Sequence, residues 1–243
     1  MKKLGRYVIF IGNLFRNREP FKVYINQTFE ECVRIGIDSI FIVAIVSSFI
    51  GAVSAVQTAH NLVSDFIPNY IISTVVRDMT IMELAPTITC IVLAGKIGSN
   101  IAGGLGTMRI TEQIDAIDVM GINSTSYLVL PKIIASLIMF PMLVIIAAAL
   151  SLTGGYVAST LTGLMTQQEY IYGLRSDFIA SNINFMMYKS VVFAFLISSI
   201  SAFQGYYTRG GALEVGKAST KAVTNSCIAV LCADYVLAQL ILG

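Results

Sequence analysis

The sequence contains little charge and few of the residue types that build catalytic or metal sites. Charged residues make up 12% of the 243 residues, tryptophan is absent, and the only histidine is His60. The four cysteines form no CxxC pair, so we expect no metal site. Hydrophobic residues make up 56% of the chain, and its mean hydropathy of +0.76 is far above that of a soluble domain. The composition predicts an integral membrane protein with no nucleic-acid partner.

Motifs of common enzymes are also missing. The chain has no GxxxxGKS/T phosphate-binding loop, no GxSxG nucleophile elbow and no HExxH metal motif. Residues 95–106, GKIGSNIAGGLG, are rich in glycine, but their order differs from that of a phosphate-binding loop. We therefore expect no catalytic residue and no cofactor in this chain. Any energy for its work would come from a partner protein or from an ion gradient.

Long uncharged runs cover residues 39–64, 133–168, 190–208 and 222–233. A helix needs about 20 apolar residues to cross the hydrocarbon core of a bilayer. These runs, with a less uniform one around residues 80–104, predict five transmembrane helices, near 39–59, 80–104, 130–155, 188–207 and 221–242. A β-barrel is not expected, because the runs do not alternate with period two. We therefore predict an all-α integral membrane protein, with residues 1–243 as one domain.

Positive charge gathers at the N-terminus. Residues 1–38 hold seven Lys and Arg, whereas the loop near 60–79 holds only Arg77. Because Lys and Arg are retained on the cytoplasmic side, this bias predicts a cytoplasmic N-terminus, and the odd number of spans then predicts an outside C-terminus. We expect the membrane to be the cytoplasmic (inner) membrane. Residues 7–34 mix aromatic, aliphatic and basic side chains, a pattern typical of a helix lying on the membrane surface. We expect residues 1–38 to form this interfacial segment and residues 39–243 the transmembrane domain.

A polar stretch, GTMRITEQIDAIDVMGI at 106–122, separates the second and third predicted spans. Its apolar residues recur at helical spacing and predict an amphipathic helix over 107–120, begun by Thr107 and ended by Gly121. A membrane-lying helix usually has a basic polar face, but this one is net acidic. We therefore expect a cytoplasmic helix that docks onto a protein. The residues concerned are Ile110, Ile114 and Ile117 on the apolar side, and Arg109, Glu112, Asp115 and Asp118.

The second predicted span has three further features. Small residues recur every fourth position, at Ala94, Gly98, Ala102 and Gly106, and predict close helix packing, either within the chain or across a dimer. Pro86 predicts a local disturbance of the helix. Ionisable residues in a span should face protein or water, because a charge facing lipid is costly. Glu83 is such a residue, and Lys189, at the outer start of the fourth span, is an expected electrostatic partner either for Glu83 or for an anionic substrate.

The run ELAPTITCIVLAGKIGSNIAGGLGTMRITEQIDAIDVMGI at 83–122 resembles the signature of the MlaE/Mce-type permeases. The similarity continues through YLVLPKIIASLIMFPML at 127–143, GGY at 154–156, KSVVFAFLIS at 189–198 and GKASTKAV at 216–223. These permeases are membrane subunits of ABC transporters that move phospholipids or related lipids between membranes. The resemblance implies an N-terminal interfacial helix, five spans and a homodimer. It also implies a cytosolic ATPase that binds ATP and Mg²⁺, and an Mce-domain substrate-binding protein on the outer side.

The same resemblance assigns roles to single residues. It implies lipid-binding positions at Glu83, Lys189 and Lys217, and an ATPase-coupling helix that contains Arg109, Thr111, Glu112, Gln113, Asp115 and Asp118. The chain departs from the family pattern at Met82, Lys96 and Gly104. Two other classes stay open, a stand-alone secondary transporter or channel and a structural scaffold. A transporter of that kind would show an internal repeat, and none is evident here.

Overall fold

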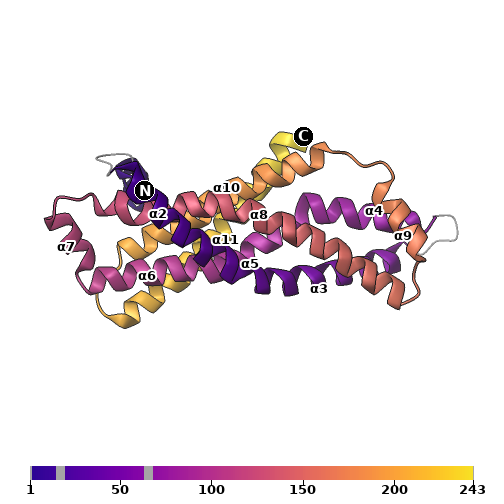
Figure 1. Cartoon of the computed structure of the whole chain (residues 1–243), viewed down its shortest axis with the longest axis horizontal. Coiled ribbons are helices and arrows are strands. Elements are labelled where there is room, and N and C mark those ends of the chain that lie inside the picture. The colour runs from indigo at the N-terminus through magenta and orange to yellow at the C-terminus, as the bar shows by residue number, and fades with distance from the viewer. Residues whose placement is uncertain (1, 15–19, 63–67, 243) are drawn as a thin grey trace. The chain divides into compact units, whose positions relative to one another are not determined.

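The computed structural model describes residues 2–14, 20–62 and 68–242, and the regular elements in these ranges are all helices (Figure 1). The predicted all-α architecture is confirmed. Elements labelled η are π-helical turns. In chain order they are α1 (Lys2–Asn13), α2 (Phe21–Cys32), η1 (Val33–Ile37), α3 (Asp38–Asn61), α4 (Tyr70–Met79), η2 (Thr80–Ile88), α5 (Thr89–Leu93), η3 (Ala94–Gly98), α6 (Ser99–Ile110), α7 (Gln113–Val119), α8 (Ser124–Leu161), α9 (Gln167–Arg175), α10 (Ser181–Tyr206) and α11 (Ala212–Leu242).

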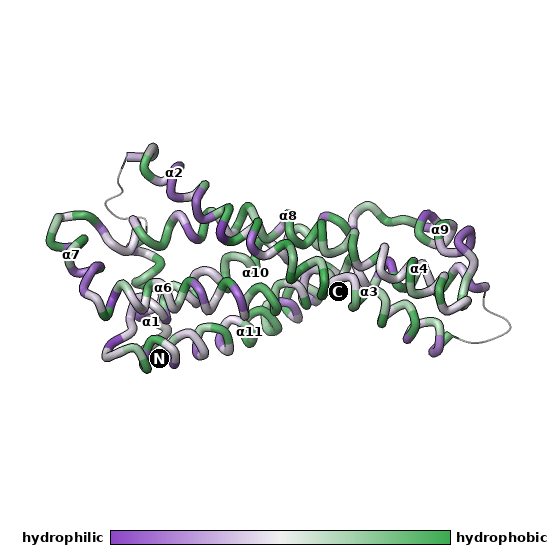
Figure 2. Tube along the Cα trace, turned by 60° about the horizontal axis from the view of Figure 1, so that its bottom comes forward, coloured by the Kyte–Doolittle hydropathy of each residue, from purple (hydrophilic) through white to green (hydrophobic). Residues whose placement is uncertain are grey.

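Five helical stretches are long and apolar enough to cross a membrane, as predicted. They are Val23–Asn61, Tyr70–Ile110, Ser124–Leu161, Ser181–Tyr206 and Ala212–Ile241. Each begins before its predicted span, because a helix satisfies its own backbone hydrogen bonds and need not end where its side chains become polar. Figure 2 shows the change along the chain: α8 is predominantly hydrophobic, whereas hydrophilic residues gather around α7 and α9.

The N-terminal segment is divided differently from the prediction. In place of one amphipathic segment over 7–34, the structure has α1 and a separate helix that begins at Phe21. This second helix continues through η1 into α3, so the backbone is helical from Phe21 to Asn61. The sequence from Phe21 to Asn61 contains no proline that would end a helix. Residues 15–19 of the predicted segment lie outside the described residues, and α1 alone remains as a distinct N-terminal helix.

The second long helix contains the predicted disturbance at Pro86. This residue lies within η2, and a second π-helical turn, η3, follows after the short α5. Proline has no N–H to donate, and a π turn changes the pairing of the backbone locally without ending the helix. The helix therefore continues through Pro86 with altered hydrogen bonding.

The helices form two compact units. One comprises Met1–Ser39, Ile91–Phe140 and Val191–Gly243, in which α6 packs along α11. Close packing is also found between α6 and α10. A Cβ atom added to Gly205 of α10 would lie 2.6 Å from the carbonyl oxygen of Ala102 in α6, so only glycine permits this approach.

The second unit comprises Ile40–Cys90 and Pro141–Ser190. Here α3 and α8 touch through their backbones at two places, because Gly51 faces the carbonyl of Ser151 and Gly154 faces that of Ser48. A side chain at either glycine would collide with the facing backbone. In the same unit α4 packs against α9, around a buried cluster of Ala55, Ala59, Ile72, Val76, Met165 and Tyr170.

Candidate functional site

Glu83 and Lys189 form an ion pair between η2 and α10, as the sequence predicted. The Nζ atom of Lys189 donates to Oε2 of Glu83 at 2.7 Å and to the carbonyl oxygen of Met82 at 3.1 Å. The hydroxyl of Thr87 donates to the other carboxylate oxygen of Glu83 at 3.3 Å. The ring of Phe185 lies 4.6 Å from the same ammonium, at cation–π distance. The lysine is therefore held in place by several independent contacts.

The two charges of this pair differ in exposure. The side chain of Lys189 is completely buried, whereas that of Glu83 is 51% exposed. A buried ammonium needs a charged or polar partner, because its desolvation costs several kcal/mol. The half-exposed carboxylate supplies that partner and still presents one side to its surroundings. The arrangement therefore holds a fixed positive charge beneath a reachable negative one, and the exposed carboxylate can contact the cationic group of a zwitterionic headgroup.

Lys217 lies elsewhere, in a cleft of about 540 Å³ within the first unit. Four cationic side chains and one carboxylate line this cleft: Arg6, Arg209, Lys217, Lys221 and Glu214. Lys217 donates to Glu214 at 2.6 Å, and both side chains are about half exposed. Tyr207 closes one side beneath Arg6, whose guanidinium lies 5.7 Å from the ring centre. Burial raises the pKa of Tyr207, so its phenol stays a neutral hydrogen-bond donor.

The prediction of one continuous helix over 107–120 is wrong, because the helix is interrupted. The helix α6 continues to Ile110, and α7 begins only at Gln113. Glu112 lies between them with φ of 59°, a left-handed conformation that breaks the helical hydrogen bonding. Thr107 consequently lies inside α6, where its hydroxyl donates to the carbonyl of Gly103 and begins no helix.

The end of α7 is as predicted. Gly121 has φ of +81°, and its N–H donates to the carbonyl of Asp118 while that of Ile122 donates to Ile117. This pair of bonds is the Schellman arrangement, which needs a left-handed residue after the helix. The short helix is therefore fixed at its C-terminal end by glycine.

Most predicted coupling residues lie on the surface around α7. Arg109 donates to Asp115 at 2.6 Å and so bridges the break between α6 and α7. Ile114 is completely buried and anchors α7, whereas Ile110 and Ile117 are partly buried. Thr111, Glu112, Gln113, Asp115 and Asp118 are exposed. Two neighbours were not predicted, Val119 and Met120, which are apolar yet 88% and 67% exposed.

The stripe of small residues lies in contacts within the chain. Ala94 and Ala102 are completely buried. A Cβ atom on Gly98 would lie 2.9 Å from Oγ of Ser201 in α10, and one on Gly106 would lie 3.1 Å from Val215 in α11. The sequence left open whether this stripe packs within the chain or across a dimer. In the structure, α10 and α11 of the same chain pack against it.

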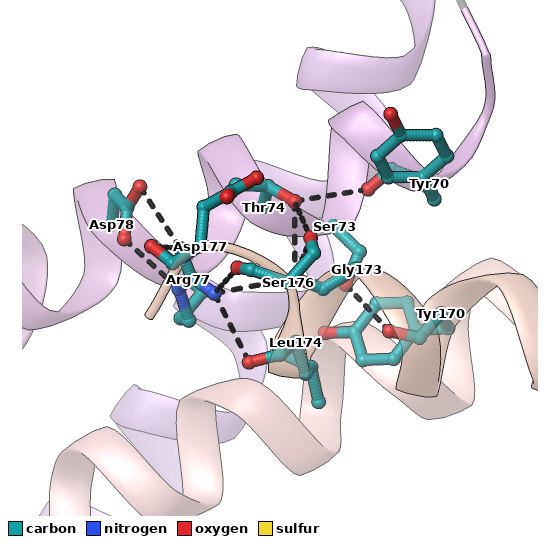
Figure 3. Close-up of polar contacts among 10 residues, drawn as sticks. All are labelled: Tyr70, Ser73, Thr74, Arg77, Asp78, Tyr170, Gly173, Leu174, Ser176 and Asp177. Atoms are coloured by element: carbon teal, nitrogen blue, oxygen red, sulfur yellow. Dashed lines mark hydrogen bonds and ion pairs between the residues drawn. The ribbon is translucent and has the colours of Figure 1, made fainter. Parts of the chain in front are cut away.

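Arg77 is a buried residue whose role the sequence did not reveal (Figure 3). Its side chain is 2% exposed and pairs with Asp78 at 2.9 Å. It also donates to the carbonyls of Leu174 at 3.1 Å and Ser176 at 2.6 Å, at the C-terminal end of α9. The last carbonyls of a helix have no partner within it, so Arg77 satisfies them and joins α4 to α9. In the sequence, Arg77 stood out only as the one Lys or Arg of the predicted loop near 60–79.

Comparisons with known proteins agree with the family resemblance of the sequence. A family model described as "Permease MlaE" matches residues 28–240. The chain belongs to the MlaE permease family. A relative from Rickettsia bellii named "Probable ABC transporter permease protein" is 35% identical over 239 residues, 98% of this chain and 92% of the relative. The Arabidopsis thaliana protein "TRIGALACTOSYLDIACYLGLYCEROL 1, chloroplastic" is 32% identical over 227 residues, 90% of this chain and 62% of the relative.

A further relative of this MlaE permease comes from Synechocystis sp. and is also named a probable ABC transporter permease protein. It is 30% identical over 229 residues, which cover 94% of this chain and 87% of the relative. The match thus extends across the long helices, the Glu83–Lys189 pair and α7.

Proposed function

We propose that this chain is the membrane subunit of an ABC transporter that moves phospholipids or related lipids between membranes. The observation that carries the proposal is the buried Lys189 ammonium paired with the half-exposed Glu83, within helices long enough to cross a membrane. Charged residues in such helices are costly and are usually retained for a function. The name of the Arabidopsis thaliana relative contains that of a diacylglycerol lipid, and this supports lipid as the substrate class.

The two charged regions would serve different parts of the lipid path. The Glu83 carboxylate would contact a headgroup at the outer side, and the buried Lys189 would hold that carboxylate in place. The cleft around Lys217, with four cations against one carboxylate, suits a phosphate group at the inner side.

A separate cytosolic ATPase would supply the energy. The surface of α7 combines exposed carboxylates with the apolar side chains of Val119 and Met120, and so fits an apolar groove with a basic rim. ATP and Mg²⁺ would bind the ATPase, and its closure would displace α7 together with the helices on either side. The complete transporter would be a homodimer with an Mce-domain protein outside, with α1 on the inner membrane surface.

Replacing Glu112 and Asp115 by lysine tests the ATPase contact. Reversing one charge on α7 and one at the residue before it should abolish co-purification of the ATPase, because the basic rim would then be repelled. The matched control is Glu169→Lys, an acidic residue of α9 far along the chain, which should leave co-purification unchanged. Normal ATPase stoichiometry with the α7 variant would contradict the proposal.

The substrate is tested by mass spectrometry of lipid bound to the natively purified complex, with Glu83→Lys as the variant. We expect phospholipid in the unmodified complex and clearly less of it in the variant, because the carboxylate proposed to meet the headgroup is lost and its replacement repels the ammonium of Lys189. Lipid transport that persists without any ATPase would favour a secondary transporter.

A further inference from the structure

We propose that Tyr206, the last residue of α10, links α7 to the N-terminal helix α1, so that a displacement of α7 moves α1. Every contact in this link lies within one compact unit. The inference rests on the proposed function only for the force that acts on α7, the docking of an ATPase. The link itself is a property of this chain.

Two charged residues of α7 reach Tyr206 through one intermediate each. Asp115 pairs with Arg109 at 2.6 Å, and the guanidinium of Arg109 lies 5.9 Å from the ring centre of Tyr206. Asp118 accepts from the backbone N–H of Ser124 at 3.4 Å, and the hydroxyl of Ser124 shares a 2.8 Å hydrogen bond with that of Tyr206. One route uses the face of the ring and the other uses its hydroxyl.

On its other side Tyr206 touches α1. The ring of Phe10 lies 5.5 Å from that of Tyr206 and is completely buried. Phe10 also packs against Phe203 and Tyr207, and Tyr7 hydrogen-bonds Ser199 of α10 at 2.7 Å. Aromatic contacts of this kind contribute about 0.5–1.5 kcal/mol each beyond area burial, so α1 is held to the end of α10 by a packed cluster.

A second contact joins the same elements. The side-chain amide of Asn123, which follows α7, donates to the carbonyl of Asn13 at the end of α1. The amide oxygen of Asn123 accepts from the N–H of Ser126 and so caps the start of α8. The connection after α7 is therefore tied directly to the last turn of α1.

The side of α1 that faces away from Tyr206 exposes apolar side chains. Val8 and Ile9 are 61% and 63% exposed there, although both are apolar. In a membrane protein such a face lies against lipid. A displacement that passes from α7 through Tyr206 would therefore shift a helix in contact with the membrane surface.

Hydrogen exchange of the permease alone, reconstituted in lipid nanodiscs, tests the link. Asp115→Asn and Asp118→Asn each loosen one route, and we expect the amides of α1 to exchange about two- to fivefold faster in each, the size of an exposed ion pair or of one hydrogen bond. In a Tyr206→Leu background both effects should be strongly reduced, and what remains of the Asp118→Asn effect would pass through the contact of Asn123 with Asn13. The matched control is Glu31→Gln, which breaks the ion pair of Glu31 with Lys132 in the same unit and should leave α1 unchanged.

Tyr206→Phe separates the two routes and preserves the packed rings. It should reduce the effect of Asp118→Asn on α1 and leave that of Asp115→Asn intact. The proposal is overturned if both α7 substitutions leave α1 exchange unchanged, or if their effects persist at full size in Tyr206→Leu. Because no ATPase is present, failure of ATPase docking would contradict the proposed function and leave this result standing.

Discussion

At the scale of single residues, Lys189 depends on its neighbours for compensation of its charge, because its side chain is completely buried. Its ammonium is removed from solvent, and its contacts with Glu83, the Met82 carbonyl and the Phe185 ring replace water. Removing one member of a buried pair is usually more harmful than removing both, because a charge is left without compensation. The half-exposed partner moderates this effect, since water can approach when the carboxylate is lost.

Glu83→Ala is therefore expected to destabilise the protein by about 1–3 kcal/mol, the contribution of a hydrogen bond to a charged group. Glu83→Gln should cost less, because its amide oxygen still accepts from Lys189. Thermal unfolding in detergent measures both. Lys217→Gln breaks an exposed ion pair and serves as the control, with an expected loss below about 1 kcal/mol. Equal stability of Glu83→Ala and Lys217→Gln would argue against a structural role for the buried pair.

Gly121 gives a second residue-scale prediction. Its φ of +81° strains any other residue, so Gly121→Ala should destabilise the end of α7 by about 1 kcal/mol. Gly104→Ala is the matched control, because Gly104 lies inside α6 with open space around it and alanine favours a helix. Hydrogen exchange of α7 should be faster in the first variant and unchanged in the second. Identical exchange in both would show that α7 does not depend on its glycine cap.

At the scale of elements, the pair α4 and α9 is held by polar contacts as well as by apolar packing. Thr74 donates to the carbonyl of Gly173 at 3.0 Å and Ser73 to that of Tyr170 at 2.8 Å, beside the contacts of Arg77 (Figure 3). Burial raises the pKa of Tyr170 to about 12, so its hydroxyl stays protonated and donates to the carbonyl of Leu152. Buried donors and acceptors are paired throughout this contact.

Arg77→Lys tests the contact between these two helices. Lysine keeps the charge but lacks the planar fork that reaches several carbonyls at once, so we expect a loss of at least about 2 kcal/mol. The measurement is limited proteolysis after Arg175 and hydrogen exchange of α9. Arg175→Lys, at an exposed position on α9, is the control and should have little effect. Unchanged exchange in Arg77→Lys would mean that apolar packing alone joins the helices.

The start of α9 should depend on pH. Thr166 and Glu169 form a capping box, in which the backbone N–H and hydroxyl of Thr166 hold the pKa of Glu169 below its usual 4.5. A lowered folded-state pKa stabilises the cap above pH 4.5, and this stabilisation is lost as the pH falls through the lowered value. Exchange in the first turn of α9 should therefore increase in acid, after correction for intrinsic rates. Glu169→Gln should remove the pH dependence, and its persistence there would assign the effect to another group.

At the scale of the whole molecule, composition and uncharged runs were sufficient to predict an all-α membrane protein with five long helices. The ion pair of Glu83 with Lys189 was also predicted, because an ionisable residue in a span needs a partner. The break at Glu112 was not, because the apolar spacing of Ile110, Ile114 and Ile117 is the same on either side of it. The burial of Arg77 was not predicted either, since it depends on α9, about 90 residues later in the chain.

Orientation is a prediction for the whole molecule. In a cysteine-free background, Gln168→Cys should react with a membrane-impermeant maleimide on intact cells, because the distribution of Lys and Arg places α9 outside. Gly211→Cys, between α10 and α11, should react only after the cells are opened. Both positions are exposed in the structure, so burial does not interfere. The reverse labelling pattern would invert the proposed topology.

The reciprocal glycines of α3 and α8 restrict how this molecule can change shape. Gly51 faces the backbone of Ser151, while Gly154, three residues further along α8, faces that of Ser48 on the earlier turn of α3. A slide of one helix past the other by a turn, about 5.4 Å, would bring side chains with Cβ atoms against both backbones. The two contacts thus hold the two helices in a single register. During a transport cycle they should travel as one rigid body, and a disulfide between them should leave turnover intact.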